Sequence, residues 1–136
     1  MNGPRVWTLE QANAMIPRLS TMVQEQLVRA SDIERLWEKL QDARKGTLGP
    51  ASNELEAELR RRVDTYEQGW RDVEALGVVV KDPRIGLCDF YGRVEGKLVW
   101  LCWRFGEPAI EHYHSLDEGF AGRKAIAGAT KQRLLN

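Results

Sequence analysis

Apolar residues recur at intervals of three and four along the first third of the chain, which is the period of an α-helix with one apolar face. Thr8 and Gln11 form a capping-box pattern, so we expect the helix to begin near Thr8. Pro17 has no backbone N–H and predicts a kink or a restart, and Gly46 is expected to end the helix. The stripe consists of Ala12, Ile16, Leu19, Val23, Leu27, Ala30, Ile33, Trp37 and Leu40.

A second helical stripe follows a short loop-like segment. Residues 46–53 read GTLGPASN, and two glycines with a proline are typical of a loop. Pairs such as Glu58 and Arg62, four positions apart with the acid first, support the helix, which is expected to end at Gly77. Two helices joined by a short loop pack antiparallel, so we predict a helical hairpin over residues 8–77. The second stripe consists of Leu55, Leu59, Val63, Tyr66, Trp70, Val73 and Leu76.

After Gly77 the apolar period changes from three or four to two. Residues 78–80 are three β-branched valines, which favour a strand over a helix. The segments LCDFYGRV (87–94) and KLVWLCWRF (97–105) flank Glu95 and Gly96, which predicts a β-hairpin with a two-residue turn. The register that follows pairs Val94 with Lys97, Tyr91 with Trp100, and Asp89 with Cys102.

The alternation divides the predicted β-hairpin into two faces. One face is apolar and is expected to pack on the helices; it carries Cys88, Phe90, Val94, Val99, Leu101, Trp103 and Phe105. The opposite face mixes charges with large aromatic rings, so we expect it to be covered, and a second copy of the chain is the candidate cover. That face carries Leu87, Asp89, Tyr91, Arg93, Leu98, Trp100, Cys102 and Arg104.

The predicted fold is α+β: a long antiparallel helical hairpin followed by a small antiparallel sheet of about three strands packed on it. The segment AIEHYH (109–114) follows a turn at Gly106 and Pro108 and supplies the third strand. We expect one domain over residues 1–136, with the hairpin at 8–77, the sheet at 78–120 and a basic, loop-like tail at 121–136.

Composition narrows the possible partners. Twenty basic residues balance twenty acidic ones, so the protein lacks the net positive electrostatic field that favours nucleic-acid binding. The tail at 121–136 has four basic residues and no acid, and it is the one candidate segment for contact with RNA or DNA. No apolar run reaches the roughly 20 residues that cross a bilayer, so no membrane span is expected. The two cysteines lie outside any CxxC pattern and no leader is recognised, which predicts free thiols and a cytoplasmic protein.

Three segments of the chain resemble a family of bacterial and archaeal proteins, domain of unknown function 2203. They are TLEQANAMIP, ALGVVVKDPRIGLCDF and LCWRFGEPAIEHYHSLDEGFAGR, and the last, with CWR, GE, His114 and GFAGR, is the most specific. The resemblance implies a helical hairpin followed by a small sheet, and it implies no activity. His112 departs from the large apolar or aromatic residue of the family pattern, so it is a poor candidate for a shared role.

Residues 101–123 hold the main concentration of reactive side chains. Asp89, which the predicted register places opposite Cys102, is added to them. The candidate ligand-binding cluster is therefore Asp89, Cys102, Arg104, Glu107, Glu111, His114 and Arg123. Cysteine, histidine and carboxylate are zinc ligands, so one interpretation is a divalent metal held by His114, Glu107, Glu111 and Cys102. A second interpretation, nucleophilic catalysis by Cys102 with His114, is weakened because the thiol lies in an apolar strand flanked by tryptophans.

The third interpretation is structural. Arg104 could pair with Asp89 across the β-hairpin or with Glu107 across the following turn, and a histidine at a strand end commonly bonds a backbone carbonyl. No catalytic motif or nucleotide-binding loop occurs in the sequence. We therefore predict a homo-oligomeric binding module without catalysis, with a dimer favoured, in which a second copy covers the sheet or extends the hairpin into a four-helix bundle. A metal-binding protein or metal-dependent enzyme is the alternative.

Overall fold

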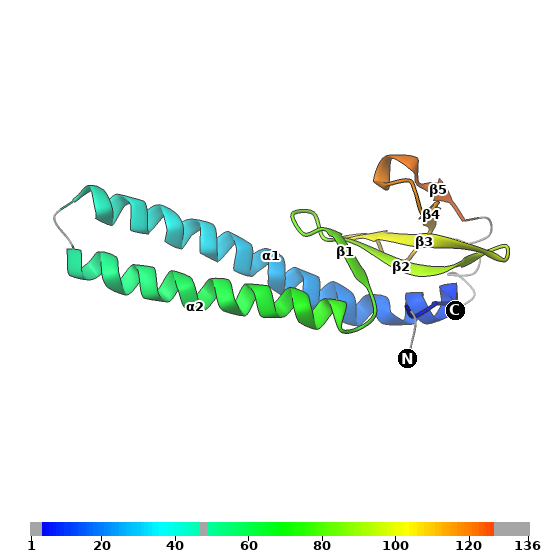
Figure 1. Ribbon diagram of the computed structural model, residues 1–136, viewed down its shortest axis with the longest axis horizontal. Helices are drawn as coiled ribbons and strands as arrows, with labels where there is room; N and C mark the ends of the chain where they lie inside the picture. Colours follow the sequence, from blue (N-terminus) through cyan, green and yellow to red (C-terminus); the bar gives the residue numbers. More distant parts are fainter. Residues whose placement is uncertain (1–3, 47–48, 127–136) are drawn as a thin grey trace.

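The structure is a computed structural model that describes residues 4–46 and 49–126. A long two-helix hairpin leads into an antiparallel sheet, and the far end of the hairpin extends well beyond the sheet (Figure 1). The elements are α1 (Leu9–Lys45), α2 (Gly49–Glu74), β1 (Val79–Asp82), β2 (Leu87–Val94), β3 (Lys97–Arg104), β4 (His112–His114), the 3₁₀-helix η1 (Phe120–Gly122) and β5 (Lys124–Ala125).

Helix α1 begins as predicted but does not break at its proline. Thr8 accepts a hydrogen bond from the Gln11 N–H at 3.0 Å, and the Gln11 side chain accepts one from the Thr8 N–H at 3.0 Å, which completes the capping box. The prediction of a restart at Pro17 is wrong, because α1 continues through it as one helix. The ring of Pro17 is exposed and the Thr21 hydroxyl donates to the Pro17 carbonyl at 3.2 Å. Among the described residues, no helix has the length and apolar character needed to span a membrane.

A buried glutamine sets how the two helices pack. The Gln26 amide is 1% exposed and donates to the Tyr66 carbonyl of α2 at 2.6 Å. Its amide oxygen accepts a hydrogen bond from Arg29 at 2.6 Å. The amide occupies the space where a side chain at Gly69 would begin, since a Cβ there would lie 2.0 Å from Gln26 Oε1. A single glycine in α2 therefore admits a polar side chain from α1 and fixes the register of the hairpin.

The sheet has five antiparallel strands in sequence order, rather than about three. The predicted register of β2 and β3 is confirmed: Val94 faces Lys97, Tyr91 faces Trp100, and Asp89 faces Cys102. Glu95 and Gly96 both have positive φ, 52° and 80°, as a two-residue hairpin turn requires. The additional strands are β1, formed by part of the valine-rich segment, and β5, which lies beyond position 120 in the segment expected to be a loop.

The core lies between the helices and one face of the sheet. Phe90, Leu101 and Trp103 are fully buried there, as the alternation predicts. Trp7 lies before the first periodic stripe and was not expected in the core, yet it is only 1% exposed. Its N–H donates to the Tyr91 carbonyl at 2.8 Å, and its indole donates to the Gly77 carbonyl at 3.1 Å. The segment before α1 thus lies along β2 and joins the base of the hairpin to the sheet.

The opposite face of the sheet is covered from within the same chain. The segment that carries η1 and β5 lies on the side of the sheet away from α1 (Figure 1). Asp89 and Cys102, which point to this side, are both 0% exposed. Farther along the same face, the Trp100 ring contacts the Tyr91 ring at 5.5 Å between centroids, and the Lys81 ammonium lies 4.2 Å from the Trp100 centroid. The expected cover is therefore supplied in part by residues C-terminal to β4.

Candidate functional site

Three side chains from three neighbouring strands meet beneath this cover. Asp89 in β2 faces Cys102 in β3, and β4 brings His114 beside them, because Cys102 faces His112 and Trp100 faces His114 in the register. One ligand atom from each of Asp89, Cys102 and His114 lies within 4.8 Å of the others, and all three residues are buried. Strand pairing therefore assembles a cysteine, a histidine and a carboxyl group from positions far apart in sequence.

The hydrogen bonds of His114 fix the chemical state of the group. His114 Nδ1 lies 3.1 Å from the Ser115 carbonyl, which can only accept, so Nδ1 carries a hydrogen. The other nitrogen, Nε2, lies 2.8 Å from Asp89 Oδ2. A hydrogen therefore lies between Nε2 and Oδ2, carried either by the imidazole ring or by the carboxyl group of Asp89. The second carboxyl oxygen, Asp89 Oδ1, is buried, and the neighbouring Cys102 thiol hydrogen-bonds to the Asp89 carboxyl group.

Burial disfavours the ionised forms of both acids in this group. Desolvation raises the pKa of Asp89 despite the opposing effect of His114 and of Lys81. Desolvation and the neighbouring Asp89 raise the pKa of the Cys102 thiol to about 12. A thiol with this pKa is protonated at neutral pH, so Cys102 in this state is not an activated nucleophile. The arrangement offers no support for the catalytic interpretation of Cys102 with His114.

A second polar group lies next to the first and ties β5 to the turn after β3. The Arg123 guanidinium donates from Nη2 to Glu107 Oε2 at 2.8 Å and to His112 Nδ1 at 2.9 Å. The side chains of Arg123 and Glu107 are 14% and 27% exposed. Glu107 Oε1 also accepts the backbone N–H of Arg104 at 2.7 Å. Arg123, which the sequence places at the start of the basic tail and in the candidate cluster, forms an ion pair with Glu107 on this side of the sheet.

The remaining candidate residues take other positions. Arg104 is exposed, and the side-chain pairing expected for it with Asp89 or Glu107 is not the one observed. Asp89 instead pairs with His114, and Glu107 pairs with Arg123. Glu111 is half-buried just before β4, and its backbone carbonyl accepts the N–H of Ile126 at 2.8 Å. The other basic residues of the tail beyond Lys124 lie outside the described residues.

Within the described residues, the group with metal-ligand geometry contains two of the four metal candidates, Cys102 and His114, and Asp89 in place of the two glutamates. The sequence offered a signal for Asp89, since the β2–β3 register already set it opposite Cys102. The β3–β4 register decides that His114 rather than His112 joins them. This register could not be predicted, because the connection between β3 and β4 is too long to specify the pairing.

The comparisons with known proteins identify a family. The sequence pattern described as "uncharacterized conserved protein (DUF2203)" matches residues 5–126, which is nearly the whole chain. A search of curated proteins found no match, and a search of solved structures also found none. The match includes the capped start of α1, all five strands and the polar groups around His114 and Arg123. The chain therefore belongs to the DUF2203 family.

Proposed function

We propose that this protein is an interaction module that associates with a second copy of itself through the far part of the helical hairpin, and that it has no catalytic activity of its own. The observation that carries the proposal is the incomplete burial of the apolar stripes where the hairpin extends beyond the sheet (Figure 1). Beyond Gln26, the only described α1 residue that is fully buried is Leu40.

The stripe residues in this region are half-covered, because two helices can bury only the sides that face each other. On α1, Ile33 and the neighbouring Leu36 are half-buried, while Trp37 is 49% exposed. The facing stripe of α2 is also only half-buried at Leu55, Leu59, Val63 and Tyr66. Exposed tryptophan is enriched where one protein surface binds another. Trp37 is therefore the side chain that we expect to anchor the contact.

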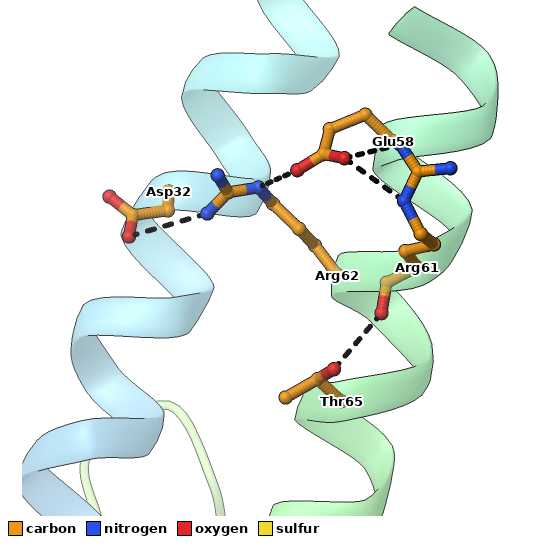
Figure 2. Close-up of polar contacts among 5 residues, drawn as sticks. All are labelled: Asp32, Glu58, Arg61, Arg62 and Thr65. Carbon is orange, nitrogen blue, oxygen red and sulfur yellow. Dashed lines mark hydrogen bonds and ion pairs between the residues drawn. The ribbon is translucent and has the colours of Figure 1, made fainter. Parts of the chain in front are cut away.

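Charged side chains flank the stripe and are already paired in a pattern suited to a helical bundle. Figure 2 shows Arg62 of α2 between Glu58 of its own helix and Asp32 of α1, with Arg62 at 2.9 Å from Glu58 and 4.0 Å from Asp32. Hydrogen bonds from Arg61 and Arg62 lower the pKa of Glu58. These residues, with Arg29 and Thr65, line a shallow hollow beside the helix contact. Three arginines and one glutamate line this hollow and Asp32 lies beside it, so both signs of charge are present, with bases in excess.

A second copy is the occupant that this surface fits best. The chain has no net charge, so two copies do not repel each other, and a mixed-charge flank can exchange ion pairs with its own symmetry mate. Two hairpins related by a two-fold axis would bury both half-exposed stripes in a four-helix bundle. Since the sheet already has an intramolecular cover over Asp89 and Cys102, the hairpin is the better of the two surfaces that the sequence suggested for dimerisation.

The test is the molar mass in solution, measured by size-exclusion chromatography with light scattering from micromolar to hundreds of micromolar concentration. We expect a dimer for the wild type and a monomer for Trp37→Glu, with unchanged helix content by circular dichroism. The matched control is Leu98→Glu, which places the same charge at an apolar residue 36% exposed on the β2–β3 hairpin. A strictly monomeric wild type, or dimerisation lost in Leu98→Glu and kept in Trp37→Glu, would contradict the proposal.

A further inference from the structure

The buried group under the η1 segment has the composition and position of a small metal centre. It joins a sulfur, a nitrogen and a carboxyl oxygen from three adjacent strands, with the ligand atoms within 4.8 Å of one another. We propose that Asp89, Cys102 and His114 bind one zinc ion, or a divalent cation with the same tetrahedral preference, and that the ion fastens β2, β3 and β4 together. This inference is independent of the hairpin contact proposed above.

The donor set selects the class of metal. Zinc binds cysteine sulfur, histidine nitrogen and aspartate oxygen, whereas calcium and magnesium require oxygen ligands throughout. Binding of the cation displaces the proton of the Cys102 thiol, and that of Asp89 where it is protonated, to solvent, and the divalent cation then neutralises the resulting thiolate and carboxylate within the fully buried site. The alternative ligands that the sequence suggested are less suitable, because the Glu107 carboxylate is already engaged by Arg123 and by the Arg104 backbone N–H.

The hydrogen bonds around the group orient the donor atoms toward a shared point. Because Nδ1 of His114 donates to the Ser115 carbonyl, the lone pair of Nε2 points at the carboxyl group of Asp89. Metal-bound histidines are commonly held in this way by a backbone carbonyl on the other ring nitrogen. The Cys102 thiol hydrogen-bonds to the Asp89 carboxyl group, so the sulfur and both carboxyl oxygens lie together in the buried site.

The distance between the His114 and Asp89 ligand atoms requires only a small adjustment, while the Cys102 sulfur lies within 4.8 Å of both. Tetrahedral zinc with bonds of about 2.0–2.1 Å to nitrogen and oxygen separates two such ligands by about 3.3 Å. His114 Nε2 and Asp89 Oδ2 are 2.8 Å apart, so the pair would open by roughly half an ångström, which is within the reach of side-chain rotation. Three protein ligands leave a fourth coordination position for a solvent molecule. Since all three ligands are buried, the ion would act on stability and not on a substrate.

The experiment uses Zn²⁺ and Co²⁺ directly with the full chain, produced and purified without an affinity tag. Elemental analysis of the purified protein is expected to give about one zinc per chain. After unfolding, removal of metal and refolding with one equivalent of Co²⁺, we expect the near-ultraviolet charge-transfer band of a cobalt thiolate and intense visible bands of tetrahedral cobalt. The band needs no variant, so it tests cysteine ligation even where substitutions prevent folding.

The chain has two cysteines, which supply a matched control. Cys88 and Cys102 are both fully buried, and Cys88 belongs to the core cluster on the helix side of the sheet. The band is expected to vanish in Cys102→Ser and to remain in Cys88→Ser, and His114→Asn and Asp89→Asn are expected to weaken cobalt binding at least tenfold. Absence of zinc and of the cobalt band in folded wild type overturns the proposal. A band that is lost in Cys88→Ser and kept in Cys102→Ser overturns it as well.

Discussion

Replacing Gly69 with alanine tests whether Gln26 fixes the register of the hairpin. On an ordinary helix surface, glycine to alanine stabilises by about 1 kcal/mol because alanine has the higher helix propensity. Here the new Cβ would lie 2.0 Å from Gln26 Oε1 and 2.4 Å from its Cδ, so the amide must leave its position. Its hydrogen bond to the Tyr66 carbonyl is then lost and a buried polar group is displaced, which costs about 2–3 kcal/mol. The net expectation for Gly69→Ala is destabilisation by roughly 1–2 kcal/mol.

The same substitution has the opposite sign when the glutamine is absent. In a Gln26→Ala background the space beside Gly69 is open, so Gly69→Ala should stabilise by about 1 kcal/mol. The coupling free energy between the two positions is therefore about 2–3 kcal/mol, measured by urea unfolding of the four proteins in a double-mutant cycle. Ala14→Gly, at an exposed position of α1, calibrates the propensity term in this protein. If Gly69→Ala stabilised both backgrounds equally, the packing of Gln26 against Gly69 would not restrain the hairpin.

Three further substitutions probe the sheet and its cover. Glu95→Asn should raise the free energy of unfolding by on the order of 0.5–1 kcal/mol in urea titrations, because Glu95 has a φ of 52° that asparagine adopts more readily; a lower value would contradict this reading of the turn. Burial raises the pKa of Cys88 from 9.0 to about 12, so the stability linked to its protonated thiol is complete below pH 9 and is lost as the pH rises toward 12. Between these pH values the free energy of unfolding of Cys88→Ala should therefore decline less steeply than that of the wild type, by about 1.4 kcal/mol per pH unit. Equal slopes for the two proteins would refute the linkage. Arg123→Met leaves the partly buried Glu107 carboxylate without its ion-pair partner and should lower stability by about 1–3 kcal/mol at pH 7, with Glu107→Gln restoring part of the loss; an unchanged urea midpoint would show that the pair contributes nothing.

The parts of the fold that depend on local pattern could be predicted from the sequence. The start of α1 follows from the Thr8–Gln11 capping box, and the β2–β3 register follows from a two-residue turn and an alternation that allows only one pairing with the apolar face inward. The restart expected at Pro17 does not occur, because a proline weighs against a helix only by local terms, while packing of Ile16 and Leu19 in the core outweighs them. β5 has only two residues, too few for a periodic signal.

The site could be predicted only to the level of its composition. The concentration of acids, histidines and cysteine between positions 101 and 123 was visible, but their partners were not. Which histidine meets Asp89 depends on the β3–β4 register, and which carboxylate meets Arg123 depends on how the chain returns over the sheet after β4. That return is set by long-range contacts, such as the hydrogen bond from Ile126 to the Glu111 carbonyl at 2.8 Å, which leave no pattern in the local sequence.

Trp7 connects the helical hairpin to the sheet, in addition to the shared hydrophobic core. Trp7 pairs its backbone with β2, donates its indole hydrogen to Gly77 at the end of the hairpin, and packs edge-on against Phe90 at 4.9 Å. The proposed dimer surface lies at the far end of this unit, while the Asp89, Cys102 and His114 group lies on the side of the sheet away from the helices. Because the two sites share no residue, Trp37→Glu should leave the cobalt spectrum unchanged, and Cys102→Ser should leave the molar mass unchanged in any variant that folds. A loss of both properties in either variant would mean that the second copy, and not the monomer fold alone, holds the metal ligands in place.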